Sequence, residues 1–166
     1  MTDIVSPSVR SRMMSGIKGK NSQPEMLVRQ MLFAAGCRYR LHRRDLPGTP
    51  DIAMPSKKVA IFVHGCFWHA HKGCKYAKVP ATRPDFWAAK LQANVERDQR
   101  AFENLTTMGW RVLYVWECAI RDHETVKSLK EKIIYWINGS TQFGEIGGPL
   151  VWPPSRGNGE VSTVHS

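Results

Sequence analysis

The sequence predicts a single α/β domain, in which short strands alternate with longer helices. Apolar, β-branched runs of strand length are separated by segments whose apolar residues recur three or four positions apart, the spacing of a helix. The chain has 166 residues, enough for one ordinary hydrophobic core but short for two. We therefore expect one domain over residues 23–138. A basic arm over 1–22 precedes it, and a tail rich in glycine, proline and serine over 139–166 follows it.

Three segments are predicted to be helices. The first covers residues 24–36, and Pro24 suits its first turn because proline lacks the N–H that a helix start leaves unpaired. The longest covers residues 84–108 and ends at Gly109. The last covers residues 124–138, with apolar side chains at helical spacing.

Four segments are predicted to be strands: residues 39–43, 51–54, 57–63 and 110–116. A tight turn joins the second and third, which predicts a β-hairpin. The hairpin would bring Asp51, at the start of one strand, beside Val63 and His64 at the end of the other. The fourth is rich in β-branched and aromatic residues, which makes it the strongest candidate for a central strand.

The formal net charge is +10, which favours a polyanionic partner. Nucleic acid fits better than an anionic membrane, because no strongly amphipathic basic helix is present and no apolar run approaches the length of a membrane span. The N-terminus lacks an apolar signal core and the cysteines lie in metal-like settings, so we expect a cytoplasmic protein that associates with the nucleoid through DNA. The arm over residues 1–22 is either a solvated tail or a segment that orders on DNA.

Cysteine and histidine are concentrated directly after the predicted hairpin. Cys66 and Cys74 bracket His69 and His71, while Cys118 follows the fourth strand. Three cysteines and one histidine match a closed structural zinc site, which takes four nitrogen or sulfur ligands. Spacing alone leaves both histidines open as the fourth ligand. The alternative is that the three cysteines are ordinary reduced residues.

An acidic site is indicated at the hairpin. A Pro-Asp pair that ends in Asp51 and leads into a hairpin is the skeleton of the PD-(D/E)xK nucleases, in which a carboxylate holds Mg²⁺. The same pair is most often only a turn. Phe62-Val63-His64 stands where those enzymes carry Glu-x-Lys, and a histidine there can bind or transfer protons. Glu25, in the first turn of a predicted helix, is explained at this stage by the helix dipole.

Four stretches resemble the very short patch repair endonucleases, in the same order and at similar spacing: Cys66–His69 after Val-His-Gly, Val79–Arg83, Asn94–Asp98 and Gly109–Cys118. The resemblance covers residues 8–138. It implies a restriction-endonuclease-like fold, a central mixed sheet flanked by helices. It also implies an enzyme that nicks one DNA strand at a thymine mispaired with guanine, the product of 5-methylcytosine deamination. The implied partners are double-stranded DNA with a T:G mismatch and a mismatch-repair accessory protein. The enzyme is expected to be a monomer that needs no membrane.

The same resemblance implies roles for five residues of the acidic site. Asp51 corresponds to the carboxylate ligand of the catalytic Mg²⁺, and Val63 supplies a backbone carbonyl where the family has threonine. His69 corresponds to the general base and His64 to a second catalytic histidine at the phosphate. Glu25 corresponds to an acidic residue that contacts water on the metal.

For zinc, the resemblance implies the ligand set Cys66, His71, Cys74 and Cys118. Gly73 lengthens the interval between His71 and Cys74 by one residue relative to the family pattern, and a glycine can form a bulge there.

The resemblance also implies a set of residues that wedge into DNA. Phe67, Trp68 and Trp87 correspond to aromatics that enter from the major groove, and Met14 to an arm residue that enters from the minor groove. Unstacking a base step costs a few kcal/mol, least at a mismatch, and a stacked ring returns about 1–3 kcal/mol per base. At its helical spacing Trp87 could equally be a core residue.

Two other functions are compatible with these features. One is a zinc-stabilised, non-catalytic DNA-binding module in which the acidic residues are structural. The other is a restriction-type nuclease that cuts both strands of fully paired DNA.

Overall fold

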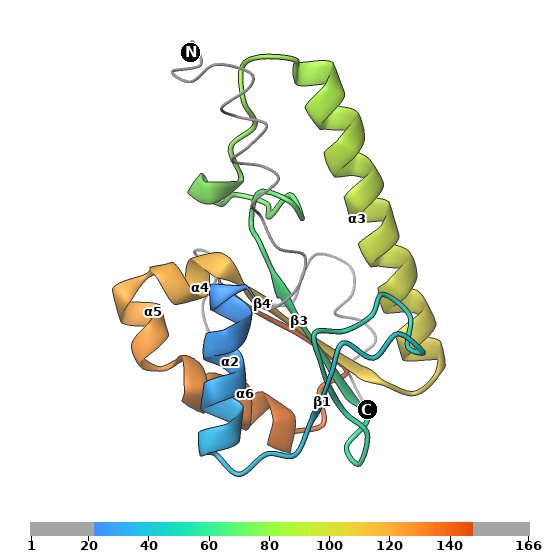
Figure 1. Ribbon diagram of the computed structural model, residues 1–166, viewed down its shortest axis with the longest axis vertical. Coiled ribbons are helices and arrows are strands. Elements are labelled where there is room, and N and C mark those ends of the chain that lie inside the picture. The colour runs from blue at the N-terminus through green and yellow to red at the C-terminus, as the bar shows by residue number, and fades with distance from the viewer. Residues whose placement is uncertain (1–21, 148–166) are drawn as a thin grey trace.

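The computed structural model describes residues 22–147, and these form a sheet between two layers of helices (Figure 1). The elements in chain order are α2 (Gln23–Ala34), β1 (Arg40–Leu41), β2 (Ile52–Met54), β3 (Val59–His64), the 3₁₀ turn η1 (Lys75–Ala77), α3 (Pro84–Thr107), β4 (Arg111–Trp116), α4 (Glu117–Arg121), α5 (His123–Lys127), α6 (Leu129–Asn138) and β5 (Phe143–Ile146). Most of the predicted basic arm, including Met14, lies outside the described residues.

The sheet is mixed and has the strand order β1-β2-β3-β4-β5. β2 runs antiparallel to both of its neighbours, β1 and β3, whereas β3, β4 and β5 run parallel to one another. The predicted hairpin is confirmed, because Ile52 of β2 pairs with Ile61 of β3. The central position predicted for residues 110–116 is also confirmed, since β4 has a neighbour on each side.

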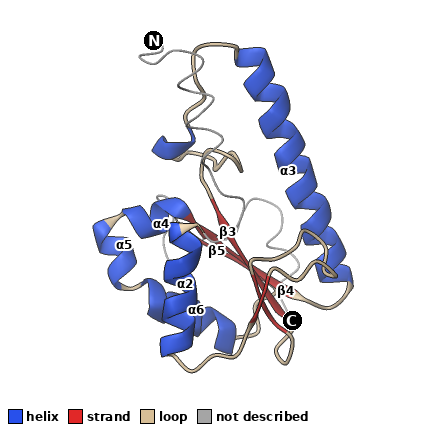
Figure 2. Cartoon of the chain, in the orientation of Figure 1, coloured by secondary structure: helices blue, strands red, loops and turns tan. Residues whose placement is uncertain are grey.

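Side chains alternate between the two faces of the sheet, and each face has its own apolar core. Helices α2 and α6 cover one face, and α3 covers the other (Figure 2). The first core includes Val28, Leu32, Ile61, Leu113 and Ile133. The second includes Leu46, Ala60, Phe62, Leu105 and Val112. Among residues 22–147, no helix has the length and apolar character needed to cross a membrane.

The predicted last helix is interrupted, and a separate helix precedes it. The Asp122 side chain accepts a hydrogen bond from the Thr125 N–H and so starts α5 anew. Ser128 then separates α5 from α6. The predicted strand over residues 39–43 is also shorter than expected. It ends before His42, whose φ of +48° turns the chain out of the extended conformation.

The domain does not end at residue 138, and that predicted boundary is wrong. Strand β5 lies within the predicted tail and pairs in parallel with β4, Ile146 opposite Val115. Gly144 allows this strand to approach α6, because a Cβ there would lie 2.3 Å from Nε1 of Trp136. Four residues of strand between glycine-containing segments carry too short a pattern to be recognised against the polar composition around them.

Candidate active site and metal centre

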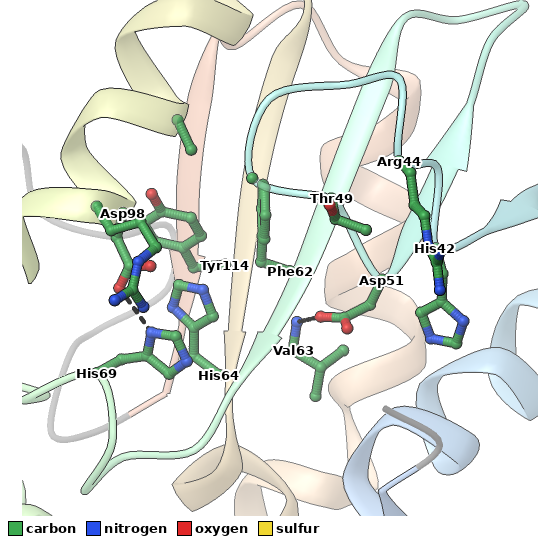
Figure 3. Close-up of a pocket in the computed structure, with 13 residues that line it drawn as sticks. His42, Arg44, Thr49, Asp51, Phe62, Val63, His64, His69, Asp98 and Tyr114 are labelled. Carbon is green, nitrogen blue, oxygen red and sulfur yellow. Dashed lines mark hydrogen bonds and ion pairs between the residues drawn. The ribbon is translucent and has the colours of Figure 1, made fainter. Parts of the chain in front are cut away.

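A cavity of about 580 Å³ lies over β3, between the loop that precedes β2 and helix α3. Asp51 lines one side of it, and His64, His69 and Asp98 line the other (Figure 3). Two exposed arginines also line it, Arg44 from the loop and Arg97 from α3. The cavity therefore combines two carboxylates, three imidazoles and two guanidinium groups, a set that suits a phosphodiester.

Asp51 is held by the hairpin, as predicted. It directly precedes β2, and its Oδ2 accepts a 2.8 Å hydrogen bond from the Val63 N–H on β3. Burial raises the pKa of Asp51 to about 7, and the nearby charge of Glu25 adds to the rise, while the Val63 hydrogen bond opposes it. A carboxylate in this position gains from a cation, which would favour its charged form.

Glu25 lies beside Asp51, although it belongs to α2, which packs on the face of the sheet opposite to α3. Its side chain is only 2% exposed and is paired with Arg29, one turn further along the helix, and with His42. Glu25, His42 and Asp51 each offer an atom within 4.8 Å of the others, so the three form one compact polar cluster. Sequence reasoning missed His42, because a histidine at the end of a two-residue strand carries no recognisable pattern.

The two predicted catalytic histidines are stacked on one another. The rings of His64 and His69 lie 3.7 Å apart, with planes 2° from parallel (Figure 3). His69 Nδ1 is 2.6 Å from Oδ2 of Asp98 on α3. One turn earlier on the same helix, Asn94 donates to the Trp68 carbonyl at 2.9 Å. Helix α3 thus holds the loop at two points and orients the His69 ring.

Asp98 was part of a resemblance motif, but sequence reasoning gave it no role. The sequence did indicate that Asn94 and Asp98 share a helix face and could contact the same neighbour, because they are four residues apart. What faces them could not be known from the helix alone.

His64 is almost completely buried at the end of β3, against Tyr114 and Trp116. Burial lowers its pKa well below the usual value, and the neighbouring His69 and His71 lower it further. The ring is therefore neutral. Its Nδ1 has no hydrogen-bond partner within residues 22–147, so it can still accept or donate one bond.

A second cluster of possible ligand atoms is separated from His64 by the Trp116 indole, which contacts both His64 and His71. Cys66, His71, Cys74 and Cys118 each offer an atom within 4.8 Å of the others. Of the two histidines left open by spacing, His71 joins the cysteines, with its Nδ1 3.5 Å from Cys118 Sγ.

Local backbone geometry and thiol chemistry both suit this cluster. Gly73 adopts a left-handed φ of +70°, which accommodates the extra residue before Cys74. The hydrogen bond with Cys118, together with burial, raises the pKa of Cys66. A cation would reverse that shift, because thiolates bind it directly. Three sulfurs and one nitrogen at this spacing can therefore hold a metal ion, and the donor set suits zinc.

The three predicted wedge aromatics form one cluster outside the core. Phe67 packs edge-on against Trp68 and Trp87, with ring centroids 4.9 and 5.2 Å away. All three are partly exposed, and Trp87 belongs to neither apolar core of the described residues. Phe86, which sequence reasoning missed, is 44% exposed and extends the cluster beside Trp87. Flat rings thus gather where the start of α3 packs against the loop that carries His69.

A cavity that combines carboxylates, an aspartate-oriented histidine and a basic wall fits a DNA endonuclease, and known proteins support that class. The family model described as DNA mismatch endonuclease Vsr matches residues 2–76. The Type II nicking enzyme V.XorIIP of Xanthomonas oryzae is 50% identical over 74% of this chain and 89% of its own length. The DNA mismatch endonuclease Vsr of Escherichia coli is 40% identical over 88% of this chain and 94% of its own.

A third relative, the Type II nicking enzyme V.NmeAIP of Neisseria meningitidis, is 37% identical over 81% of this chain and 95% of its own length. These relatives are matched over nearly their full lengths. The chain belongs to the Vsr family of DNA mismatch endonucleases.

Proposed function

We propose that this protein nicks one strand of duplex DNA at a T:G mismatch left by deamination of 5-methylcytosine, by Mg²⁺-dependent hydrolysis. The observation that carries the proposal is that Asp51 and the His69–Asp98 pair face one basic cavity, beside a cluster of partly exposed aromatic rings. One face of the molecule thus offers groups for hydrolysis next to groups for base stacking. The mixed sheet, with Asp51 at the hairpin, favours a restriction-endonuclease-like fold.

The metal ion would be held by the Asp51 carboxylate and the Val63 carbonyl, with Glu25 close enough to contact its water. The buried carboxylate with a raised pKa fits such a cation. When bound, Mg²⁺ supplies positive charge that stabilises the scissile phosphate as its negative charge develops. Val63 in place of threonine leaves this role intact, because the ligand is a main-chain oxygen.

His69 is the general base in this proposal. A carboxylate can only accept, so the 2.6 Å contact puts a proton on Nδ1 of His69 and leaves Nε2 able to take one from the attacking water. Asp98 also stabilises the imidazolium that results. His64 stays neutral because it is buried, and it serves as a hydrogen-bond partner for the phosphate rather than as a second charge.

The cysteine cluster would hold a structural zinc ion. Cys66, His71 and Cys74 belong to the loop itself, so the metal would fix the backbone of residues 66–74, which carry Phe67, Trp68 and His69. The aromatic rings can then enter a base step without first being ordered. At a T:G pair the cost of unstacking is smallest, so ring insertion favours the mismatch over an intact pair.

The proposal is tested on end-labelled duplexes that differ at one base pair, T:G against T:A and C:G. We expect a nick in one strand of the T:G duplex only, and only with Mg²⁺ present. Asp51→Asn should lower the rate by more than about 100-fold while DNA binding is retained. Glu124→Gln is the matched control, an exposed carboxylate on α5 paired with Lys127.

Each rival function makes a different prediction in this assay. Binding without nicking would indicate a DNA-binding module. Cleavage of both strands in fully paired duplexes would indicate a restriction-type enzyme. Nicking that survives in Asp51→Asn would refute the role of Asp51.

A further inference from the structure

His42 lines the cavity and connects Asp51, which also lines it, with the buried Glu25 of α2. The main-chain N–H of His42 donates to the main-chain carbonyl of Asp51 at 3.2 Å, and the ring Nε2 lies 2.8 Å from Oε2 of Glu25. The residue adopts a left-handed φ of +48°, which is uncommon for a side chain other than glycine. One residue thus binds the main chain of Asp51 and the carboxylate of Glu25, although these two come from different elements.

The hydrogen-bond chemistry decides what the ring does. Glu25 Oε2 is an acceptor when ionised, so a contact of 2.8 Å requires a proton on Nε2 of His42. The Arg29 Nη2 atom, 3.4 Å from the same nitrogen, can only donate and cannot take this proton. A protonated nitrogen is not a metal ligand. Through Nε2, therefore, the ring holds Glu25 and does not coordinate a cation.

Charge and burial show why Glu25 needs to be held. The side chain is 2% exposed, and a buried carboxylate is costly unless hydrogen bonds and opposite charge compensate it. Arg29 and His42 both contact Oε2. Glu25 and Asp51 each offer a carboxylate oxygen within 4.8 Å of the other, so the two negative charges repel when no cation separates them. Without a fixed partner, Glu25 would relax away from Asp51.

We propose that His42 is a positioning residue that holds Glu25 against Asp51 and thereby sets the affinity of the acidic site for its divalent cation. The inference rests on the proposed function, since that function supplies the cation. His42 acts through its ring Nε2–H, which donates to Glu25, and it is not a ligand of the cation. A glutamine at position 42 carries an N–H at a similar reach and should replace it, whereas a residue without a donor should not.

The experiment compares the full-length protein with His42→Ala, His42→Gln and the control His123→Gln, an exposed histidine at the start of α5. Two quantities are measured. The first is the Mg²⁺ concentration that gives half-maximal single-turnover nicking of the T:G duplex. The second is Mn²⁺ binding to the DNA-free protein, followed by the loss of the free-ion signal in electron paramagnetic resonance.

We expect His42→Ala to raise the half-maximal Mg²⁺ concentration and to weaken Mn²⁺ binding, each by about 10–100-fold, the usual effect of removing an outer-shell residue of a metal site, with DNA affinity unchanged. His42→Gln should restore both to within about threefold of the parent, well inside that range. A His42→Ala protein with normal cation dependence and only a lower melting temperature would overturn the proposal. So would a glutamine variant as defective as alanine, which would make the imidazole itself a ligand.

If His42→Ala does not fold, His42→Met takes its place, since methionine fills similar volume without an N–H donor.

Failure of the proposed function looks different from failure of this inference. In the first case the parent does not nick the T:G duplex, while Mn²⁺ binding still reports on His42. In the second the parent nicks normally and the substitutions at His42 change neither measurement.

Discussion

The indole of Trp116 lies flat against the imidazole of His71, with ring centroids 3.9 Å apart and planes 3° from parallel. The same indole meets His64 edge-on at 5.2 Å, and its Nε1 donates to Oε1 of Glu145 at 3.0 Å. Trp116, at the end of β4, therefore contacts the cysteine cluster, the cavity and strand β5 together.

Trp116→Leu should weaken zinc binding by about 10–100-fold, because it removes the surface that orients a proposed ligand. Trp116→Phe keeps a flat ring against His71 and should retain the metal, although it loses the hydrogen bond to Glu145. The rate of zinc transfer to a chromogenic chelator measures the difference. Equal rates for the two variants would show that ring stacking does not orient His71.

Cys118→Ser should lose the metal together with cooperative thermal unfolding. Structural zinc is worth about 10–16 kcal/mol of apparent binding free energy, and small domains are stable by only about 5–15 kcal/mol. Cys37→Ser is the matched control, because Cys37 is half-buried and outside the cluster. Metal analysis of the purified protein should give one equivalent of zinc. A metal-free protein that unfolds cooperatively at the same temperature would contradict the prediction.

Asp98→Asn should slow the nicking step by about 10²–10⁴-fold, because the amide can leave His69 in the wrong tautomer and cannot stabilise the imidazolium. DNA affinity should not change. Single-turnover kinetics separate the two quantities. Glu96→Gln, an exposed carboxylate on the same helix, controls for the loss of one charge. An unchanged rate would remove Asp98 from the reaction.

Trp68→Ala should reduce the preference for T:G over paired DNA by about 1–3 kcal/mol, the contribution of one stacked base. The ratio of nicking efficiencies on the two duplexes measures it. Phe33→Ala serves as the control, since Phe33 is 77% exposed on α2, away from the aromatic cluster. If the ratio stays the same, Trp68 supports the loop and does not read the mismatch.

Gly144→Ala should lower the free energy of unfolding by about 1–3 kcal/mol, because the added Cβ overlaps the Trp136 indole. Gly139→Ala is the control: its Cβ would make only ordinary contacts at 3.5 Å, and the expected change is within about 0.5 kcal/mol. Urea unfolding of both variants provides the comparison. A silent Gly144→Ala would mean that β5 does not contribute to the stability of the domain.

Local sequence patterns were sufficient to predict a contact where the interacting residues lie in one short stretch of chain. The hairpin followed from two apolar runs around a tight turn, and it placed Asp51 next to Val63. The density of cysteine and histidine after β3 likewise indicated a metal cluster, although spacing did not separate His69 from His71. These conclusions depend on neighbours along the chain, and turn geometry is set locally.

The α/β class, the hairpin that holds the acidic site and the kinds of residue on the following loop could all be inferred from local sequence patterns. Three features emerged from long-range packing alone: the contact of His42 with Glu25, the contact of Asp98 with His69 and the pairing of β5 with β4. The physical reason is that these contacts join elements whose separation is set by strand order and by helix packing on the two faces of the sheet. A single segment's periodicity shows which face is buried, but not what lies against it.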